Sequence, residues 1–217
     1  SILPTPEVHK EAMGLIIKDS GVQAVYGPKS DVLKSDIQDL LESGVAIPRT
    51  EVVSTNTATS ETKFKGITEA VYSVADGQAV SITEVKDPVF AQKMMGDGYA
   101  VEPVNGNVYA PVSGTVTSVF PTKHAVGILS DQGVEVLVHV GLDTVALNGA
   151  PFSTKVADGQ HVQAGDLLLV ADLDAIRSAD RETTIVVAFT NSAEIKSVSL
   201  VNLGQVSKDS QVATVEL

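Results

Sequence analysis

Short runs of β-branched residues, each broken by Gly, Pro, Asp or Asn, fill the chain from residue 66 to residue 217. Turn signals recur about every 8–12 residues, which is typical of an antiparallel sandwich or barrel. The clearest runs are residues 114–120, 125–129, 134–140, 167–171 and 184–189. Only residues 87–95 and 173–179 have the pattern of short helices. The sequence therefore predicts an all-β fold, an antiparallel β-sandwich or squashed barrel, for residues 66–217.

Two further zones precede this one. Residues 1–45 contain apolar runs at 13–17 and 22–26, separated by a turn, and then a helical pattern that Ser30 caps and Gly44 ends. Two strands and one helix bury too little for a core of their own, so we expect a small α+β fragment of a larger domain. Residues 46–65 are rich in Ser and Thr without periodicity, which predicts a flexible linker.

Composition narrows the possible functions. The formal net charge of −12 repels nucleic acid and favours partners that present Lys or Arg. The chain has no cysteine, which excludes disulfides, thiolate metal sites and a cysteine nucleophile. It has no apolar run of membrane-spanning length and no N-terminal signal pattern. We therefore expect a soluble, intracellular protein that does not bind nucleic acid.

The chain has four histidines, of which two stand apart. His9 lies in the incomplete first zone and His161 follows a turn, so we expect both to be exposed, with no obvious partner. His124 and His139 flank a turn at residues 131–133. A hairpin centred on this turn pairs residues whose numbers add to about 264, which brings both imidazoles to the same end of the ladder.

Strand periodicity gives the second strand of this hairpin two different faces. The residues on one face are Val134, Val136, Val138 and Val140, and those on the other are Glu135, Leu137 and His139. The valines suit a buried face. His139 therefore belongs to the opposite face, together with Leu137.

Two neighbouring imidazoles permit several chemistries. They can hold zinc if a third or fourth ligand is supplied, or act as acid and base near neutral pH. One neutral ring can also capture a phosphoryl group while the other hydrogen-bonds to its oxygens. A pair of hairpin histidines without function is equally compatible with the spacing, which leaves all these alternatives open.

Several strings occur in order along residues 66–217: Asp87-Pro88-Val89-Phe90-Ala91, residues 96–98, residues 110–116, Phe120-Pro121-Thr122-Lys123-His124-Ala125, residues 133–145 and residues 159–166. With them this segment resembles the glucose-type enzyme IIA domain of the bacterial phosphoenolpyruvate-dependent sugar phosphotransferase system. Residues 13–42 resemble the end of the matching enzyme IIB domain, through residues 21–27 and 29–31, without that domain's phosphoacceptor cysteine. The order implies a parent permease arranged C-B-A, with residues 1–45 from IIB, 46–65 as linker and 66–217 as IIA.

The resemblance implies a role for each site residue. His139 would be phosphorylated on its far ring nitrogen, while the backbone carbonyl of Gly141 holds the near one. His124, positioned by Thr122, would stabilise the phosphoryl group. Partner docking would use an apolar recess and two acidic residues: Val89, Phe90, Met94, Met95, Phe120, Leu137, Asp87 and Asp143. No cofactor is implied beyond the covalent phosphoryl group, and zinc would bind between His124 and His139 only with a partner carboxylate.

The implied function is that of a phosphotransferase. The histidine-containing phosphocarrier protein would phosphorylate His139, and the IIB cysteine of the same permease would receive the group beside the membrane IIC domain, at the cytoplasmic face. A phosphorylation-dependent regulatory binding module is the alternative. A structural β-domain like the biotinyl or lipoyl carriers is a third, although no Met-Lys-Met occurs. Some relatives have Phe at Met94, Leu137 or Val140, which predicts a different partner preference; the transported sugar is not encoded here.

Overall fold

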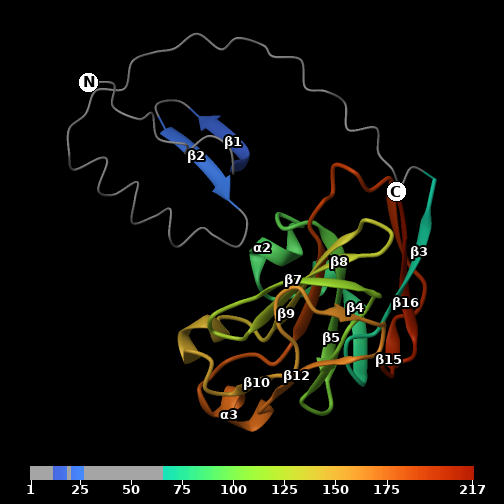
Figure 1. Cartoon of the computed structure of the whole chain (residues 1–217). Coiled ribbons are helices and arrows are strands. Elements are labelled where there is room, and N and C mark those ends of the chain that lie inside the picture. Colours follow the sequence, from blue (N-terminus) through green and yellow to red (C-terminus); the bar gives the residue numbers. More distant parts are fainter. Residues whose placement is uncertain (1–11, 19–20, 27–65) are drawn as a thin grey trace, which may run out of the picture. The chain divides into compact units, whose positions relative to one another are not determined.

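The computed structural model describes residues 12–18, 21–26 and 66–217 (Figure 1). The chain divides into two compact units, Ser1–Thr59 and Ser60–Leu217. In the first unit, β1 (Ala12–Lys18) and β2 (Gly21–Tyr26) form the antiparallel hairpin that the sequence predicts. The predicted helix ending at Gly44, the linker and His9 lie outside the described residues. The predicted domain boundaries therefore stay predictions.

Within residues 66–217, antiparallel sheets make up most of the second unit. The largest sheet has the strand order β11-β7-β8-β9-β13-β5-β4-β15, and two sheets of three strands have the orders β10-β12-β6 and β14-β16-β3. The strands are β3 (Thr68–Tyr72), β4 (Gly77–Ser81), β5 (Asp97–Pro103), β6 (Asn107–Tyr109), β7 (Gly114–Val119), β8 (Ala125–Ser130), β9 (Glu135–Val140), β10 (Phe152–Thr154), β11 (His161–Val162), β12 (Leu167–Ala171), β13 (Ile185–Phe189), β14 (Ser197–Leu200), β15 (Gly204–Val206) and β16 (Gln211–Glu216). The predicted all-β antiparallel fold is confirmed.

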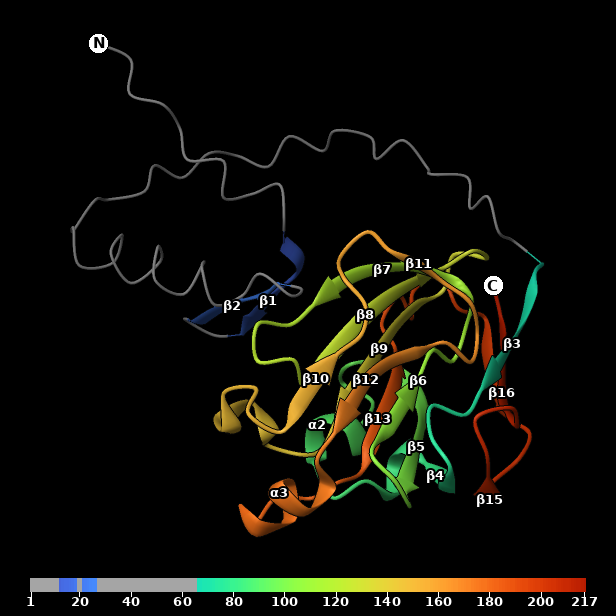
Figure 2. The ribbon, with the colours of Figure 1, turned by 60° about the horizontal axis from the view of Figure 1, so that its bottom comes forward.

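The main core fills the space between these sheets. In Figure 2 the β10-β12-β6 sheet overlies the large sheet, and the two share one cluster of buried side chains. Val136 and Val138 of β9 are at most 2% exposed in this cluster, as the predicted alternation requires. Figure 1 shows β3 and β16 side by side along one flank, where they add Val71 and Val215.

A second, smaller core lies on the other face of the large sheet. Strand β13 is buried on both faces, because Ile185, Val187 and Phe189 join the main core while Val186 and Ala188 face the smaller one. The smaller core is covered by a 3₁₀ turn, η1 (Ile82–Glu84), and a short helix, α2 (Pro88–Ala91). This cover matters for function because Val186 is the β13 residue that pairs with His139.

The helices differ more from expectation than the strands do. Helix α3 (Leu173–Ser178) matches its prediction closely, but α2 ends at Ala91 and the predicted helix over 87–95 is too long. The chain turns at Lys93 (φ 57°) and Gly96 (φ 113°). A side chain at Gly96 would collide with the carbonyl oxygen of Phe189, so the pairing of β5 with β13 ends the helix. The 3₁₀ turns η1 and η2 (Thr144–Leu147) were not predicted.

Candidate functional site

The β8–β9 hairpin brings two histidine rings into contact. Ala125 pairs with His139 and Val126 with Val138, which is the predicted register. The residue before β8 is His124, and its carbonyl oxygen accepts a 2.7 Å hydrogen bond from the Val140 amide. The two ring centroids lie 4.9 Å apart with an angle of 80° between the planes. The hairpin therefore delivers the predicted imidazole pair.

A tight turn just before His124 holds this residue in place. The Lys123 amide donates to the carbonyl of Phe120, and Lys123 adopts a left-handed conformation with φ 55°. This turn places the Thr122 hydroxyl 2.6 Å from Nδ1 of His124, and the Phe120 ring meets the His124 ring edge-on at 5.5 Å. Because Nδ1 is engaged by Thr122, Nε2 is the nitrogen left for a ligand. Burial lowers the pKa of His124, so the ring is neutral at neutral pH.

His139 is partly buried, and the apolar side chain of Phe90 covers it. The Phe90 ring lies 5.2 Å from the His139 ring at an angle of 60°. Burial, helped by the nearby His124, lowers the pKa of His139 to about 4, and the Gly141 backbone and Asp87 oppose this fall. The ring is therefore an unprotonated imidazole at neutral pH, and such a ring has a nitrogen lone pair that can attack.

The predicted hydrogen bond from His139 to the Gly141 carbonyl stays a prediction. Nδ1 of His139 is buried among residues 66–217. The backbone of Gly141 acts on the ring, since it raises the pKa of His139. Withdrawal of Nδ1 from solvent still leaves Nε2 as the accessible side of a partly exposed ring. The geometry thus favours reaction at the far nitrogen.

The loop after β9 fixes the backbone beneath His139. Gly141 has φ 75°, and a side chain there would lie 2.4 Å from the Thr144 methyl group and 2.8 Å from the Glu182 carbonyl oxygen. The Gly141 amide donates to the Thr184 carbonyl, and the buried Thr144 hydroxyl donates to the Val140 carbonyl at 2.7 Å. The sequence does not predict this hydrogen bond of Thr144, because the bond forms only when the loop folds back on strand β9.

The predicted docking residues differ in how far their side chains are exposed. Val89, Met94 and Met95 are exposed, with Met94 at 70%. Phe120 and Leu137 are partly exposed, whereas Phe90 is buried. Asp143 is exposed in a left-handed conformation, and the side chain of Asp87 instead accepts a hydrogen bond from the Val89 amide. Exposed apolar side chains of this kind are a candidate surface for a protein partner.

The histidine pair does not form a metal site by itself. Within residues 66–217, no group of three or more His, Cys, Asp or Glu side chains could hold a metal ion. Zinc takes four ligands, so an ion shared by His124 and His139 would need donors from another molecule. The expectation of zinc only with a partner carboxylate stays a prediction.

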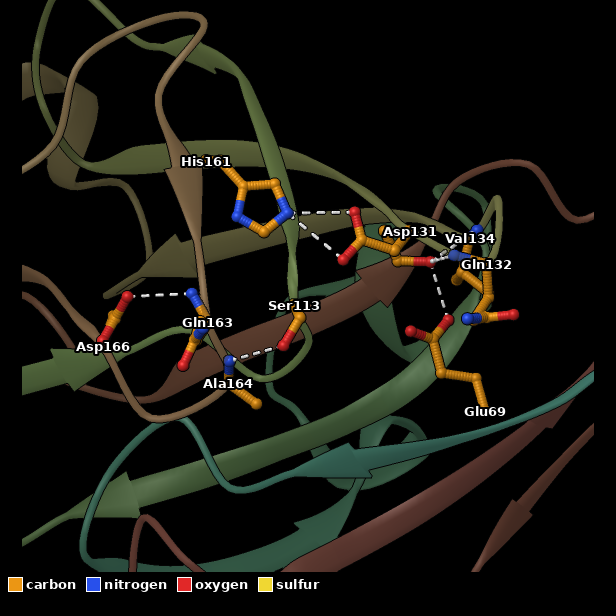
Figure 3. A network of polar contacts seen from close by, with 10 residues as sticks. Glu69, Ser113, Asp131, Gln132, Val134, His161, Gln163, Ala164 and Asp166 are labelled. Atoms are coloured by element: carbon orange, nitrogen blue, oxygen red, sulfur yellow. Dashed lines mark hydrogen bonds and ion pairs between the residues drawn. The ribbon is translucent and has the colours of Figure 1, made fainter.

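The remaining described histidine lies at the opposite end of the hairpin. His161 is exposed, as predicted, but it does have a partner: its Nε2 lies 3.0 Å from Oδ1 of Asp131 (Figure 3). Asp131 begins the β8–β9 turn, and the adjacent Ser130 hydroxyl donates to buried Glu69 at 2.7 Å. Burial, with the nearby Asp131 charge, raises the pKa of Glu69 although the Ser130 bond opposes this. The prediction that His161 has no partner was wrong, because Asp131 lies far from it in the sequence.

The described part of the chain contains no helix that is both long and apolar enough to cross a membrane.

Comparisons with known proteins support one family. Residues 69–195 match the family model of the phosphoenolpyruvate-dependent sugar phosphotransferase system, EIIA 1. The chain is 63% identical over 207 residues to the PTS system glucose-specific EIICBA component of Streptococcus pneumoniae, covering 95% of this chain and 28% of that protein. It is 42% identical over 183 residues to the PTS system glucosamine-specific EIICBA component of Bacillus subtilis, covering 84% and 28%.

Structural comparison agrees with the sequence comparison. The fold matches glucose permease IIA from Mycoplasma capricolum with a TM-score of 0.65 and 39% identity, covering 68% of this chain and 96% of that one. The chain thus spans 28% of the length of the curated relatives above but nearly all of this solved structure.

Proposed function

Because the chain belongs to the EIIA 1 family of the phosphoenolpyruvate-dependent sugar phosphotransferase system, we propose that His139 carries a phosphoryl group between two protein partners. The donor is the phosphorylated histidine-containing phosphocarrier protein, and the acceptor is the cysteine of an enzyme IIB domain. The observation that carries this proposal is the contact between two neutral imidazoles whose Nδ1 atoms are both withdrawn, one by Thr122 and one by burial.

In the first step the Nε2 lone pair of His139 attacks phosphorus. The phosphorus–nitrogen bond of the donor breaks as the new bond forms, and the donor imidazole keeps the electron pair. The proton of His139 stays on Nδ1. In the second step the phosphorus–Nε2 bond breaks as a cysteine thiolate of IIB binds phosphorus. His124 hydrogen-bonds to the phosphoryl oxygens and offsets their charge in both steps.

The partners follow from the relatives. The relatives from Streptococcus pneumoniae and Bacillus subtilis are EIICBA components, which supports a permease in which IIB and IIC domains accompany this chain at the cytoplasmic face of the membrane. The match to the Streptococcus protein covers more of the chain than the EIIA 1 model does, which supports residues 1–45 as the end of a IIB domain. We propose no cofactor beyond the phosphoryl group itself.

Labelling tests the proposal directly. The chain is incubated with radiolabelled phosphoenolpyruvate, enzyme I and the phosphocarrier protein, and one acid-labile, base-stable phosphate is expected. His139→Ala should abolish the label. His161→Ala is the matched control, because it removes an exposed imidazole that lies at the other end of the same hairpin. Equal labelling of His139→Ala and the parent chain would contradict the assignment.

A regulatory binding module is the second candidate. Val89, Met94 and Met95, on and just after the helix that carries Phe90, are exposed, which would suit a partner whose binding depends on phosphorylation. The two functions separate in one assay. A regulatory module binds its partner in only one phosphorylation state, whereas the carrier passes label to IIB. Transfer to a IIB cysteine within the turnover time of sugar uptake would favour the carrier.

A further inference from the structure

Asp87 lies at the start of helix α2. Its Oδ1 atom accepts a hydrogen bond of 2.7 Å from the Val89 amide, and its carbonyl accepts one of 2.9 Å from Ala91. Asp87 has the extended conformation of an N-cap (φ −80°, ψ 121°), and Pro88 occupies the first helical position. Because α2 has only four residues, it has few internal hydrogen bonds, and its cap is a large part of what holds it.

The helix that Asp87 caps carries the aromatic cover of the phosphoacceptor. Phe90 is 7% exposed and packs in the smaller core with Val186 and Ala188. On its other side, its ring lies 5.2 Å from the His139 ring. The packing of Phe90 against the sheet and against His139 both depend on where α2 begins. A change at Asp87 therefore reaches His139 through Val89 and Phe90.

Asp87 also affects His139 by its charge. Its carboxylate opposes the fall of the His139 pKa, whereas His124 adds to that fall. Lys86, which precedes Asp87, pairs with Glu182 instead. The single side chain of Asp87 thus combines a helix cap and a nearby negative charge, and substitution can separate the two.

We propose that Asp87 is a positioning residue for phosphoryl transfer, because its cap on α2 holds Phe90 against the ring of His139. This role rests on the proposed function of His139 and is separate from any contact between the Asp87 charge and a basic partner. The cap sets the orientation of the nucleophile and keeps water from one face of its ring. The charge acts on the encounter with the partner.

Substitution distinguishes the cap from the charge. Asn and Ser are both good N-cap residues without charge, whereas Ala removes the cap as well. Asp87→Asn and Asp87→Ser should therefore keep Phe90 in place. Asp87→Ala should release α2 and loosen the contact between Phe90 and His139. Phe90→Leu serves as the reference for loss of the aromatic cover without loss of the cap.

The experiment measures single-turnover phosphorylation of the full chain by the phosphorylated phosphocarrier protein over a range of donor concentrations. For Asp87→Asn and Asp87→Ser, we expect a maximal rate within about twofold of the parent and a higher half-saturating concentration. For Asp87→Ala, we expect the same rise plus a maximal rate lowered about tenfold, in line with the loss of one N-cap. Phe90→Leu should lower the maximal rate without raising the half-saturating concentration.

Two further measurements show whether the structure changes locally at His139 or is lost altogether. Histidine ring NMR signals should move for His139 in Asp87→Ala and Phe90→Leu but stay near the parent positions in Asp87→Asn, while those of His161 stay constant in all variants. Thermal unfolding excludes global loss of structure. Equal maximal rates and equal His139 signals for Asp87→Ala and Asp87→Asn would overturn the positioning role. A parent chain that takes up no phosphate would instead overturn the proposed function.

Discussion

A histidine lies near each end of the β8–β9 hairpin, and the two have different chemical surroundings. His139 is part of β9, whereas His161 belongs to β11 and contacts the hairpin turn. At one end, His139 contacts the rings of Phe90 and His124, and its Nδ1 is buried. At the other end, His161 is exposed and pairs with the Asp131 carboxylate. One imidazole packs against two other rings, and the other contacts an exposed carboxylate.

This difference bears on the proposal that His139 is the phosphoacceptor. A nucleophile needs a neutral ring and a free nitrogen lone pair, and the burial that lowers the pKa of His139 supplies the first. The carboxylate next to His161 engages its Nε2 and ties β11 to the β8–β9 turn. Under the proposed function, the same residue type thus serves chemistry at one end of the hairpin and the fold at the other.

The largest effect on stability is expected from substitution of Gly141, which follows β9, compared with Gly159, which lies near His161. Gly141 (φ 75°) is enclosed by Thr144 and Glu182, whereas a side chain at Gly159 (φ 79°), two residues before His161, would meet nothing within 4 Å. We expect Gly141→Ala to lower the free energy of unfolding by about 3 kcal/mol, from a left-handed conformation and overpacking together. Gly159→Ala should cost about 1 kcal/mol. Urea unfolding of both variants checks this, and equal losses would contradict the account.

His124 provides the next test. His124→Gln should still accept phosphate on His139, but onward transfer to IIB should fall about 100-fold, because the second imidazole is lost. His161→Gln is the matched control and should transfer at the parent rate. Rapid-quench measurement of each half-reaction separates acceptance from transfer. Normal onward transfer by His124→Gln would remove its role.

The free energy of unfolding should also depend on pH through His139. The pKa of His139 is about 4 in the folded chain and 6.5 as a free side chain, so between these values the unfolded chain binds more protons. The contribution of His139 to stability is therefore fully present above pH 6.5 and lost as pH falls toward 4. Buried Glu69, whose pKa is raised, acts in the opposite direction.

The comparison between the parent chain and His139→Gln isolates this contribution. Across that pH window we expect the free energies of unfolding of the two chains to diverge by about 1–2 kcal/mol, after allowance for partial exposure of the ring. Urea unfolding at several pH values measures it. A constant difference would show that His139 titrates normally. His161→Gln provides the comparison at the other end of the hairpin.

The smallest effect on stability is expected at the contact between His161 and Asp131. His161→Ala removes a contact between two side chains that are about half exposed, so the free energy of unfolding should fall by less than about 0.5 kcal/mol. Phosphoryl acceptance and transfer should not change. A large loss of stability would mean that the Asp131 pair, and not only the Ser130–Glu69 contact, holds the turn.

The sequence predicts the hairpin well because local signals determine it. The turn at residues 131–133, with Gly133 at φ 96°, and the alternation along β9 together set the register, which places His124 beside His139. The spacing alone left zinc binding, acid–base catalysis, phosphoryl capture and no function open. The family resemblance chose among these alternatives, and the comparisons show the family.

The sequence predicts less where distant segments decide the conformation. Helix α2 stops early because β5 must pair with β13, and Gly96 meets the Phe189 carbonyl there. The pairing of His161 with Asp131 joins two turns that no periodic pattern connects. The sequence leaves Asp87 open between a residue at the end of a helix and a contact for a basic partner, and the structure shows that it caps α2.

Identification of the phosphorylated nitrogen tests the central claim most directly. After phosphorylation by phosphoenolpyruvate, enzyme I and the phosphocarrier protein, long-range proton–nitrogen NMR of the chain labelled with ¹⁵N-histidine assigns the phosphorus to one ring atom. We expect the phosphoryl group on Nε2 of His139, with His124 and His161 unmodified. A phosphoryl group on His161, on His124, or on Nδ1 of His139 would contradict the account.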